Sequence, residues 1–266
     1  MKKKTRWPIY LIIGLIITFI AFTVPLPYYI EVPGTSEDIR KVLQVNNQPD
    51  QEEGSYQFVT VGVKHARLVD LVYAWLTPFT DIRSAKEMTG GSSDAEYMRI
   101  NQFYMETSQN MAKYQGLKTA GKEIELKYLG VYVLTVTDNS TFKGILNIAD
   151  TVTAVNDKTF ESSKEMVDYV NSQTLGDKVK VTYQEDGKVK TAEGKIITLE
   201  NGKNGIGIGL IDRTEVSSDV PIKFSTAGIG GPSAGLMFSL SIYTQIADPT
   251  LRNGRIIAGT GSIDRD

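Results

Sequence analysis

Residues 144–157 read "GILNIADTVTAVND", and this stretch decides how the middle of the chain folds. An apolar turn comes first, Asp150 follows, and a short β-branched strand then ends in an Asn-Asp pair that is typical of a hairpin turn. Upstream, "YLGVYV" at residues 128–133 predicts a strand. Downstream, residues 162–173 predict a serine-capped helix and residues 177–196 a hairpin that turns at Glu185-Asp186-Gly187. This order of elements predicts a compact small domain.

Residues 127–199 resemble a PDZ domain in the circular order that is typical of bacterial proteases. "YLGVYV" stands where that family has its carboxylate-binding loop, and "GILNIADTVTAVN" matches its G-L-x-x-G-D-x-I-x-x-V-N stretch, with Ala149 in place of the usual glycine. PDZ domains bind an extended peptide as an added strand on an exposed sheet edge. The resemblance therefore implies a groove between residues 130–136 and the helix at 163–173. The alternative is a domain that only packs against its neighbour. The implied peptide-binding residues are Leu129, Gly130, Val131, Tyr132 and Val133.

The composition excludes several classes of function. The chain has 266 residues, enough for two domains, and a net charge of −2, so we expect no nucleic-acid partner. It contains no cysteine, which excludes a disulfide framework, a thiol nucleophile and a Cys-ligated zinc site. His65 is the single histidine, so zinc proteases that use two histidines are excluded as well. We expect neither a metal nor a cofactor.

The amino terminus predicts a membrane anchor. Four basic residues lie within residues 1–6, and residues 7–30 carry no charge. An apolar stretch of this length is typical of a spanning helix, and the basic residues predict a cytoplasmic N-terminus with the acidic remainder outside the cell. A cleaved signal peptide is the alternative. We expect residues 1–30 to be a cytoplasmic tip and an uncleaved single-pass anchor in the cell membrane.

The regions on either side of the small domain mix helices and strands, so the expected fold class is α+β. Residues 55–63 predict a strand, and a long helix should begin at Ser92, Ser93 or Asp94 and close at Gly116. The periodicity predicts a helix from Pro232 onward, followed by a strand at "RIIAG". Residues 68–79 predict a further helix that stops at Pro78.

The stretch "GIGGPSAG" (residues 228–235) raises the possibility that Ser233 is a nucleophile. A nucleophilic serine needs a sharp turn, nearby backbone N–H groups for an oxyanion, and a base. A glycine-rich turn before a helix provides the free N–H groups and a favourable dipole. The stretch matches neither the Gly-x-Ser-x-Gly elbow nor a phosphate-binding loop. By composition alone, a capped structural turn is an equally good interpretation.

Two residues of the chain could serve as the base, and neither fits well. A Ser-His-Asp triad would have to use His65, and a lone histidine is more often an ordinary surface or packing residue. A lysine base must be kept neutral by burial. Lys223 lies ten residues before Ser233 and would have to fold back to reach it.

"GGPSAG" with its apolar helix, followed by "IIAGTGSID", resembles the Lon-type serine–lysine proteases. The resemblance implies that Ser233 is the nucleophile and that Thr260 positions the catalytic lysine. In that family the lysine belongs to a downstream Gly-Gly-x-Lys motif, which does not occur up to Asp266. We therefore expect a fragment that lacks its general base and is inactive by itself. The implied active-site loop also includes Gly230, Gly231, Pro232, Ala234 and Gly235.

The protease resemblance extends to "GSYQFVTV" (residues 54–61) and to "YMETSQNMA" (residues 104–112), which is similar to a Glu-Ser-x-x-x-Ala helix of that family. Residues 31–126 and 200–266 would then form one Lon-like protease domain, with the PDZ domain at 127–199 inserted into it or preceding its second half.

Taken together, the chain is identified as a member of the membrane-anchored PDZ–Lon-like peptidases of Gram-positive bacteria. This implies an ATP-independent endopeptidase that cleaves secreted peptides or proteins, with a peptide pheromone as the first expected substrate. The absence of a Walker motif agrees with ATP independence. The alternative is a non-catalytic, membrane-anchored PDZ adaptor, and the oligomeric state is left open.

Overall fold

The computed structural model describes residues 6–185 and 187–264. The chain forms two compact units. The first comprises Met1–Ser36 and Val59–Asp94, and the second comprises Glu37–Phe58 and Ala95–Asp266. Strand β3 (Ser55–Arg67) contributes its first four residues to the second unit and the rest to the first.

The first unit combines short helices with a strand pairing. β1 (Pro25–Asp38) pairs antiparallel with β4 (Asp81–Ser84), with Ile30 opposite Ile82. α2 begins where the Asp70 carboxylate accepts the Arg67 N–H at 2.9 Å, which satisfies one of the free donors of the first turn. The helices of this unit are α1 (Trp7–Thr23), α2 (Leu68–Leu76) and α3 (Ala85–Thr89).

The prediction of a membrane anchor at residues 7–30 is wrong. α1 ends at Thr23, and β1 begins at Pro25, whose ring and missing N–H do not continue a helix. At about 1.5 Å per residue, such a helix is about 25 Å long, shorter than a hydrocarbon core of about 30 Å. Across residues 6–185 and 187–264, no helix combines the length and the apolar character needed to cross a membrane. The predicted single-pass topology and extracellular location are therefore corrected; the basic residues 2–4 lie outside the described residues.

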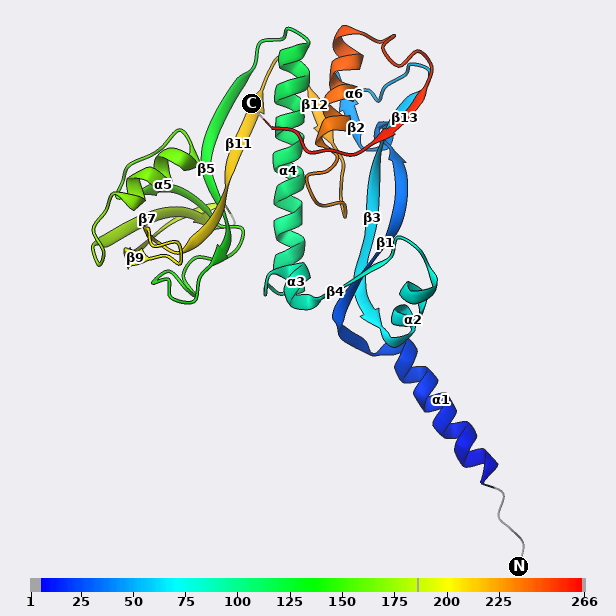
Figure 1. Ribbon diagram of the computed structural model, residues 1–266. Coiled ribbons are helices and arrows are strands. Elements are labelled where there is room, and N and C mark those ends of the chain that lie inside the picture. Colours follow the sequence, from blue (N-terminus) through cyan, green and yellow to red (C-terminus); the bar gives the residue numbers. More distant parts are fainter. Residues whose placement is uncertain (1–5, 186, 265–266) are drawn as a thin grey trace, which may run out of the picture. The chain divides into compact units, whose positions relative to one another are not determined.

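A five-stranded sheet organises the middle of the chain in the order β11-β5-β6-β7-β8, with every neighbouring pair antiparallel (Figure 1). The predicted turn is confirmed: Asn156 and Asp157 have φ of 50° and 61°, and Val155 and Lys158 exchange backbone hydrogen bonds. The cap is confirmed as well, because the Ser162 hydroxyl accepts the Glu165 N–H at 3.2 Å. The elements are β5 (Glu125–Val136), β6 (Thr151–Val155), α5 (Ser163–Asn171), β7 (Lys178–Glu185), β8 (Lys188–Lys195) and β11 (Ile208–Ser217), with a short pair β9 (Ile197–Thr198) and β10 (Asn204–Gly205).

A second core joins α4 (Asp94–Thr119) to α6 (Gly235–Ala247). Around them, η1 (Ile39–Lys41) precedes β2 (Leu43–Val45), which pairs antiparallel with β12 (Ile222–Phe224). β13 (Ile256–Gly259) runs parallel to the start of β3. The buried side chains of this core include Leu43, Phe58, Met105, Ala112, Leu117, Met237, Phe238 and Ile242.

Two predicted helix boundaries are corrected. α4 continues past Gly116 to Thr119, and Gly116 is buried. A Cβ at Gly116 would lie 2.8 Å from Ile242 Cγ2 and 3.0 Å from the Ser239 carbonyl oxygen. The glycine therefore allows α4 and α6 to approach closely rather than ending a helix. Likewise, α6 begins at Gly235 and not at Pro232, which lies in the turn before it.

Candidate functional site

The turn around Ser233 lies between β12 and α6, and its serine is exposed. One side of this turn is held by α4. The Gly231 N–H donates to the Asn101 carbonyl at 2.8 Å, and the buried Ser108 hydroxyl donates to the Pro232 carbonyl at 2.9 Å. Gly231 has φ of +88°, a conformation that favours glycine. The glycine-rich stretch is thus a defined turn.

The other side of the turn is held by the segment that follows β13. The Gly261 N–H donates to the Ser233 carbonyl at 2.7 Å, and the Thr260 hydroxyl donates to the same oxygen at 3.3 Å. The Leu236 N–H in turn donates to the Gly261 carbonyl at 2.9 Å. The structure therefore brings together Ser233 and Thr260, which were both expected in one site although 27 positions separate them.

A hollow of about 230 Å³ lies against the loop that leads to Ser233. Gln109 donates to the Thr226 hydroxyl at 2.7 Å and so ties the loop to α4 beside it. The lining mixes amide, carboxylate and apolar groups. The lining residues are Gln102, Met105, Glu106 and Gln109 of α4 and Thr226, Ala227, Gly228 and Ile229 of the loop.

Three basic side chains are candidates for the general base, and each has a different environment. His65 bonds through Nε2 to the Asp94 carboxylate at 2.6 Å within the first unit. Lys223 is exposed on β12, opposite Gln44 of β2. Burial lowers the pKa of Lys113 on α4, with Glu215 opposing the shift, and its ammonium lies 5.7 Å from the centre of the Phe224 ring. Lys113 was missed in the sequence, because helical spacing alone does not show which lysine becomes half-buried.

The predicted peptide-binding strand is paired on both sides. Val131 and Tyr132 of β5 face Val152 and Thr151 of β6. On the opposite side, β5 pairs with β11 along its length (Figure 1). In this register Asp212 lies opposite Val131. In this structure β11 therefore covers the edge of residues 130–136 that was expected to face a peptide. Residues 208–217 showed only strand character in the sequence, and nothing in that pattern indicates which strand they pair with.

Tyr132 contacts α4. Its ring stacks on Phe103 with 4.0 Å between the centres, and its hydroxyl donates to the Glu106 carboxylate at 2.7 Å. Burial, together with the bond to Glu106, raises the pKa of Tyr132, so the phenol is a neutral donor. The Arg213 guanidinium of β11 lies 5.0 Å from the same ring. This predicted binding residue therefore joins the small domain to α4.

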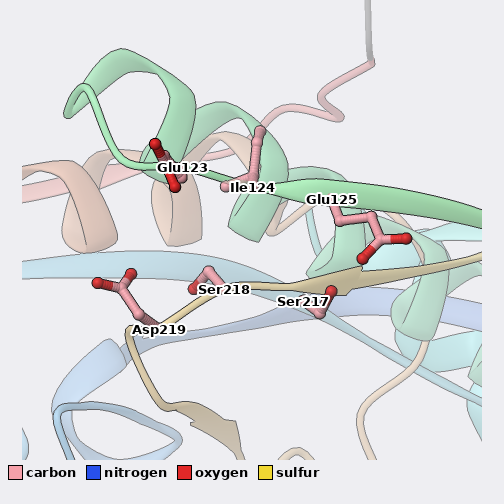
Figure 2. A pocket seen from close by; sticks show the side chains of 6 residues that line it. All are labelled: Glu123, Ile124, Glu125, Ser217, Ser218 and Asp219. Atoms are coloured by element: carbon pink, nitrogen blue, oxygen red, sulfur yellow. The ribbon is translucent and has the colours of Figure 1, made fainter.

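A larger hollow, of about 450 Å³, lies where β5 begins and β11 ends. Figure 2 shows its lining, which places three carboxylates and two serines around an open surface. In the part of the chain that the structure describes, no group of three or more His, Cys, Asp or Glu side chains is arranged to hold a metal ion. The hollow is lined by Glu123, Ile124, Glu125, Ser217, Ser218 and Asp219.

Comparison with known proteins identifies one familiar part of the chain. A family model of the PDZ domain matches residues 102–196, a segment that also includes most of α4. No curated protein matches the chain.

Three solved structures are similar over about a third of the chain. The PDZ domain of an SdrC-like protein from Listeria monocytogenes is 35% identical and has a TM-score of 0.31; the match covers 33% of this chain and 93% of that domain. For the corresponding domain from Listeria innocua, the identity is 38%, the coverages are 30% and 92%, and the TM-score is 0.30. A Geobacillus thermodenitrificans structure is 30% identical, with coverages of 30% and 94% and a TM-score of 0.28.

Proposed function

Because the chain contains a PDZ domain, we propose that it acts on a peptide or protein partner and that Ser233 is the nucleophile of a serine endopeptidase. The observation that carries the proposal is the support of the Ser233 turn from two directions. Thr260 and Gly261 donate to the Ser233 carbonyl, while Ser108 donates to the Pro232 carbonyl. These bonds hold the main chain and leave the serine exposed. Such a turn suits a reactive hydroxyl that must meet a substrate in one orientation.

The proposed reaction is acyl transfer to the serine. Ser233 Oγ attacks a peptide carbonyl, its proton passes to a general base, and the base returns that proton to the leaving amine. Water then hydrolyses the acyl-enzyme. The first turn of α6 follows the serine closely, and the dipole of this helix favours the negative charge that forms on the carbonyl oxygen. No ATP is needed for this step.

The general base belongs to the proposal as well. The likeness to Lon-type proteases assigns this role to a lysine in a Gly-Gly-x-Lys motif, with Thr260 positioning it. Residues 1–266 contain no such motif, so we propose that this lysine lies outside them and that residues 1–266 alone are inactive. In this scheme, residues 31–126 and 200–266 contribute to one protease domain around the PDZ domain.

The test is cleavage of a fluorogenic peptide library by a protein that includes the motif lysine, without ATP. Ser233→Ala should reduce kcat by at least about 1000-fold, because the covalent step is lost. Ser225→Ala is the matched control, since Ser225 is an exposed serine of the same loop, and it should keep its activity. Cleavage that Ser233→Ala leaves undiminished would contradict the assignment of the nucleophile.

A second candidate function is a non-catalytic PDZ adaptor. It is favoured by the bond of His65, the single histidine of the chain, to the Asp94 carboxylate, and by the contact of the Lys113 ammonium with the Phe224 ring. In this case the Ser233 turn only caps α6. Peptide binding without any cleavage, in a protein that has the motif lysine, would support the adaptor over the protease.

A further inference from the structure

The sheet edge that a PDZ ligand would use is occupied by β11. β5 lies between β6 and β11, and each residue from Ile208 to Ser217 has a partner in β5. A strand between two neighbours has its main-chain donors and acceptors paired on both sides. An extended peptide can therefore add to β5 only where β11 has left.

β11 is also bound by the helix beside the groove. Ser163, the first residue of α5, donates its N–H to the Asp212 carboxylate at 3.1 Å. A carboxylate at a helix N-terminus is stabilised by the free N–H groups and by the helix dipole. Ile208 and Leu210 of the same strand pack against the buried core of the PDZ domain. The main chain, the apolar side chains and the Asp212 carboxylate of β11 thus all contact the PDZ domain, as those of a bound peptide would.

The pairing of β11 with β5 is incomplete in two respects. Its register is irregular between Gly209 and Leu210 and again between Arg213 and Thr214. The hydroxyls of Thr214 and its register partner Tyr128 are buried, and within the described part of the chain neither has a hydrogen-bond partner. Burying an unpaired hydroxyl costs free energy that its exposure would recover. The strand is therefore held less tightly than its length suggests.

We propose that residues 208–217 are an internal ligand of the PDZ groove. The groove then accepts an external extended peptide only by exchange with β11. The features of β11 define the chemistry of that peptide: an aliphatic residue at the place of Leu210 and an acidic residue two positions later, at the place of Asp212. The inference rests on the PDZ domain and is independent of the nucleophile Ser233.

The geometry offers a reversible covalent lock. A Cβ at Gly209 would lie 3.6 Å from the Cβ of Thr135, within the range of a disulfide. The chain has no cysteine of its own, so Gly209→Cys with Thr135→Cys creates a single possible bridge. Oxidation should hold β11 on β5, and reduction should release it.

The disulfide is combined with substitutions that weaken the contacts of β11. Leu210→Ala with Asp212→Ala removes the apolar and carboxylate contacts and keeps the main chain. The probe is a fluorescein-labelled peptide with the sequence of residues 208–217, measured by fluorescence anisotropy against the 266-residue chain. Glu215→Ala with Ser217→Ala is the control pair, because both residues are exposed on the same strand.

Weakening β11 should tighten probe binding at least about tenfold over the unsubstituted chain and the control pair, since it raises the fraction of open groove. In the locked and weakened chain, binding should be absent after oxidation and return after reduction. Equal binding in both redox states would overturn the proposal, and so would no binding in either.

Hydrogen exchange of β7 checks that the domain stays folded, and the oxidised and reduced forms have the same sequence. The assay involves no cleavage, so its result is separate from the test of Ser233.

Discussion

Asp50→Ala is expected to lower the free energy of unfolding of the second unit by about 3 kcal/mol, near the lower end of the range for breaking a buried ion pair. Asp50 pairs with Arg252, and the two side chains are 5% and 0% exposed. Alanine would leave a buried guanidinium without its counter-charge. The lower end of this range applies because the Arg252 guanidinium retains two neighbours in the variant. These are the Glu53 carbonyl at 3.4 Å and the Tyr56 ring at 5.3 Å.

Further variants of the pair separate the cost of an unpaired charge from the cost of lost packing. Asp50→Asn keeps an acceptor for the Glu52 N–H and should cost less, about 1–2 kcal/mol. Replacing both partners by apolar residues, as Asp50→Leu with Arg252→Met, should cost less than Asp50→Ala, because no charge is left buried. The matched control is Asp38→Ala. Its partner Arg40 is 41% exposed, and the expected loss is about 0.2–1 kcal/mol.

The assay is hydrogen exchange measured by mass spectrometry in rising urea, read on the peptide that contains α6. This readout reports the unit that holds the pair and avoids averaging over the whole chain. If Asp50→Ala proved no more harmful than Asp38→Ala, the argument from burial would be refuted. A double variant as unstable as Asp50→Ala would refute the argument from the unpaired charge.

Two further predictions concern Tyr132 and Gly116. Burial and the bond to Glu106 raise the pKa of Tyr132 above its ordinary value of 10.0, so above pH 10 the unfolded chain loses a proton that the folded protein keeps. The free energy of unfolding should therefore fall as the pH rises past about 10. Tyr132→Phe should make this fall less steep in urea midpoints measured between pH 8 and 11. Identical pH profiles of the variant and the unsubstituted chain would contradict this. Gly116→Leu should cost about 1–3 kcal/mol in the same denaturation, because its Cβ would lie 2.8 Å from Ile242 Cγ2. Thr119 is exposed on the same helix, and Thr119→Leu should change the free energy of unfolding by less than about 0.5 kcal/mol. Equal losses for the Gly116 and Thr119 variants would refute the packing role of Gly116.

Local signals predicted the small domain well. The Asn156-Asp157 turn and the Ser162 cap depend on residues within four positions of one another, so the sequence alone specifies them. The same holds for the strands flanking this turn. Residue types at short spacing were therefore enough to predict a compact small domain, and the family match to residues 102–196 supports its resemblance to a PDZ domain.

Predictions that needed more than local pattern were less accurate. The uncharged stretch of residues 7–30 predicted one long helix, but Pro25 starts β1 and the helix is shorter. Gly116 was expected to end α4, since composition does not distinguish a helix end from a close contact with Ile242. At Pro25 one local signal outweighed another, whereas at Gly116 the packing of α4 against α6 outweighed the local rule.

By itself, the sequence determined the helix cap and the turn of the small domain, and its resemblances to known families implied the PDZ domain and the candidate roles of Ser233 and Thr260. The tertiary structure alone decided that Thr260 and Gly261 donate to the Ser233 carbonyl and that β11 lies on β5. The physical reason is range. Caps and turns form between groups that the chain already holds close, whereas a strand edge accepts any extended segment, and only the packing of the whole fold selects which one it receives.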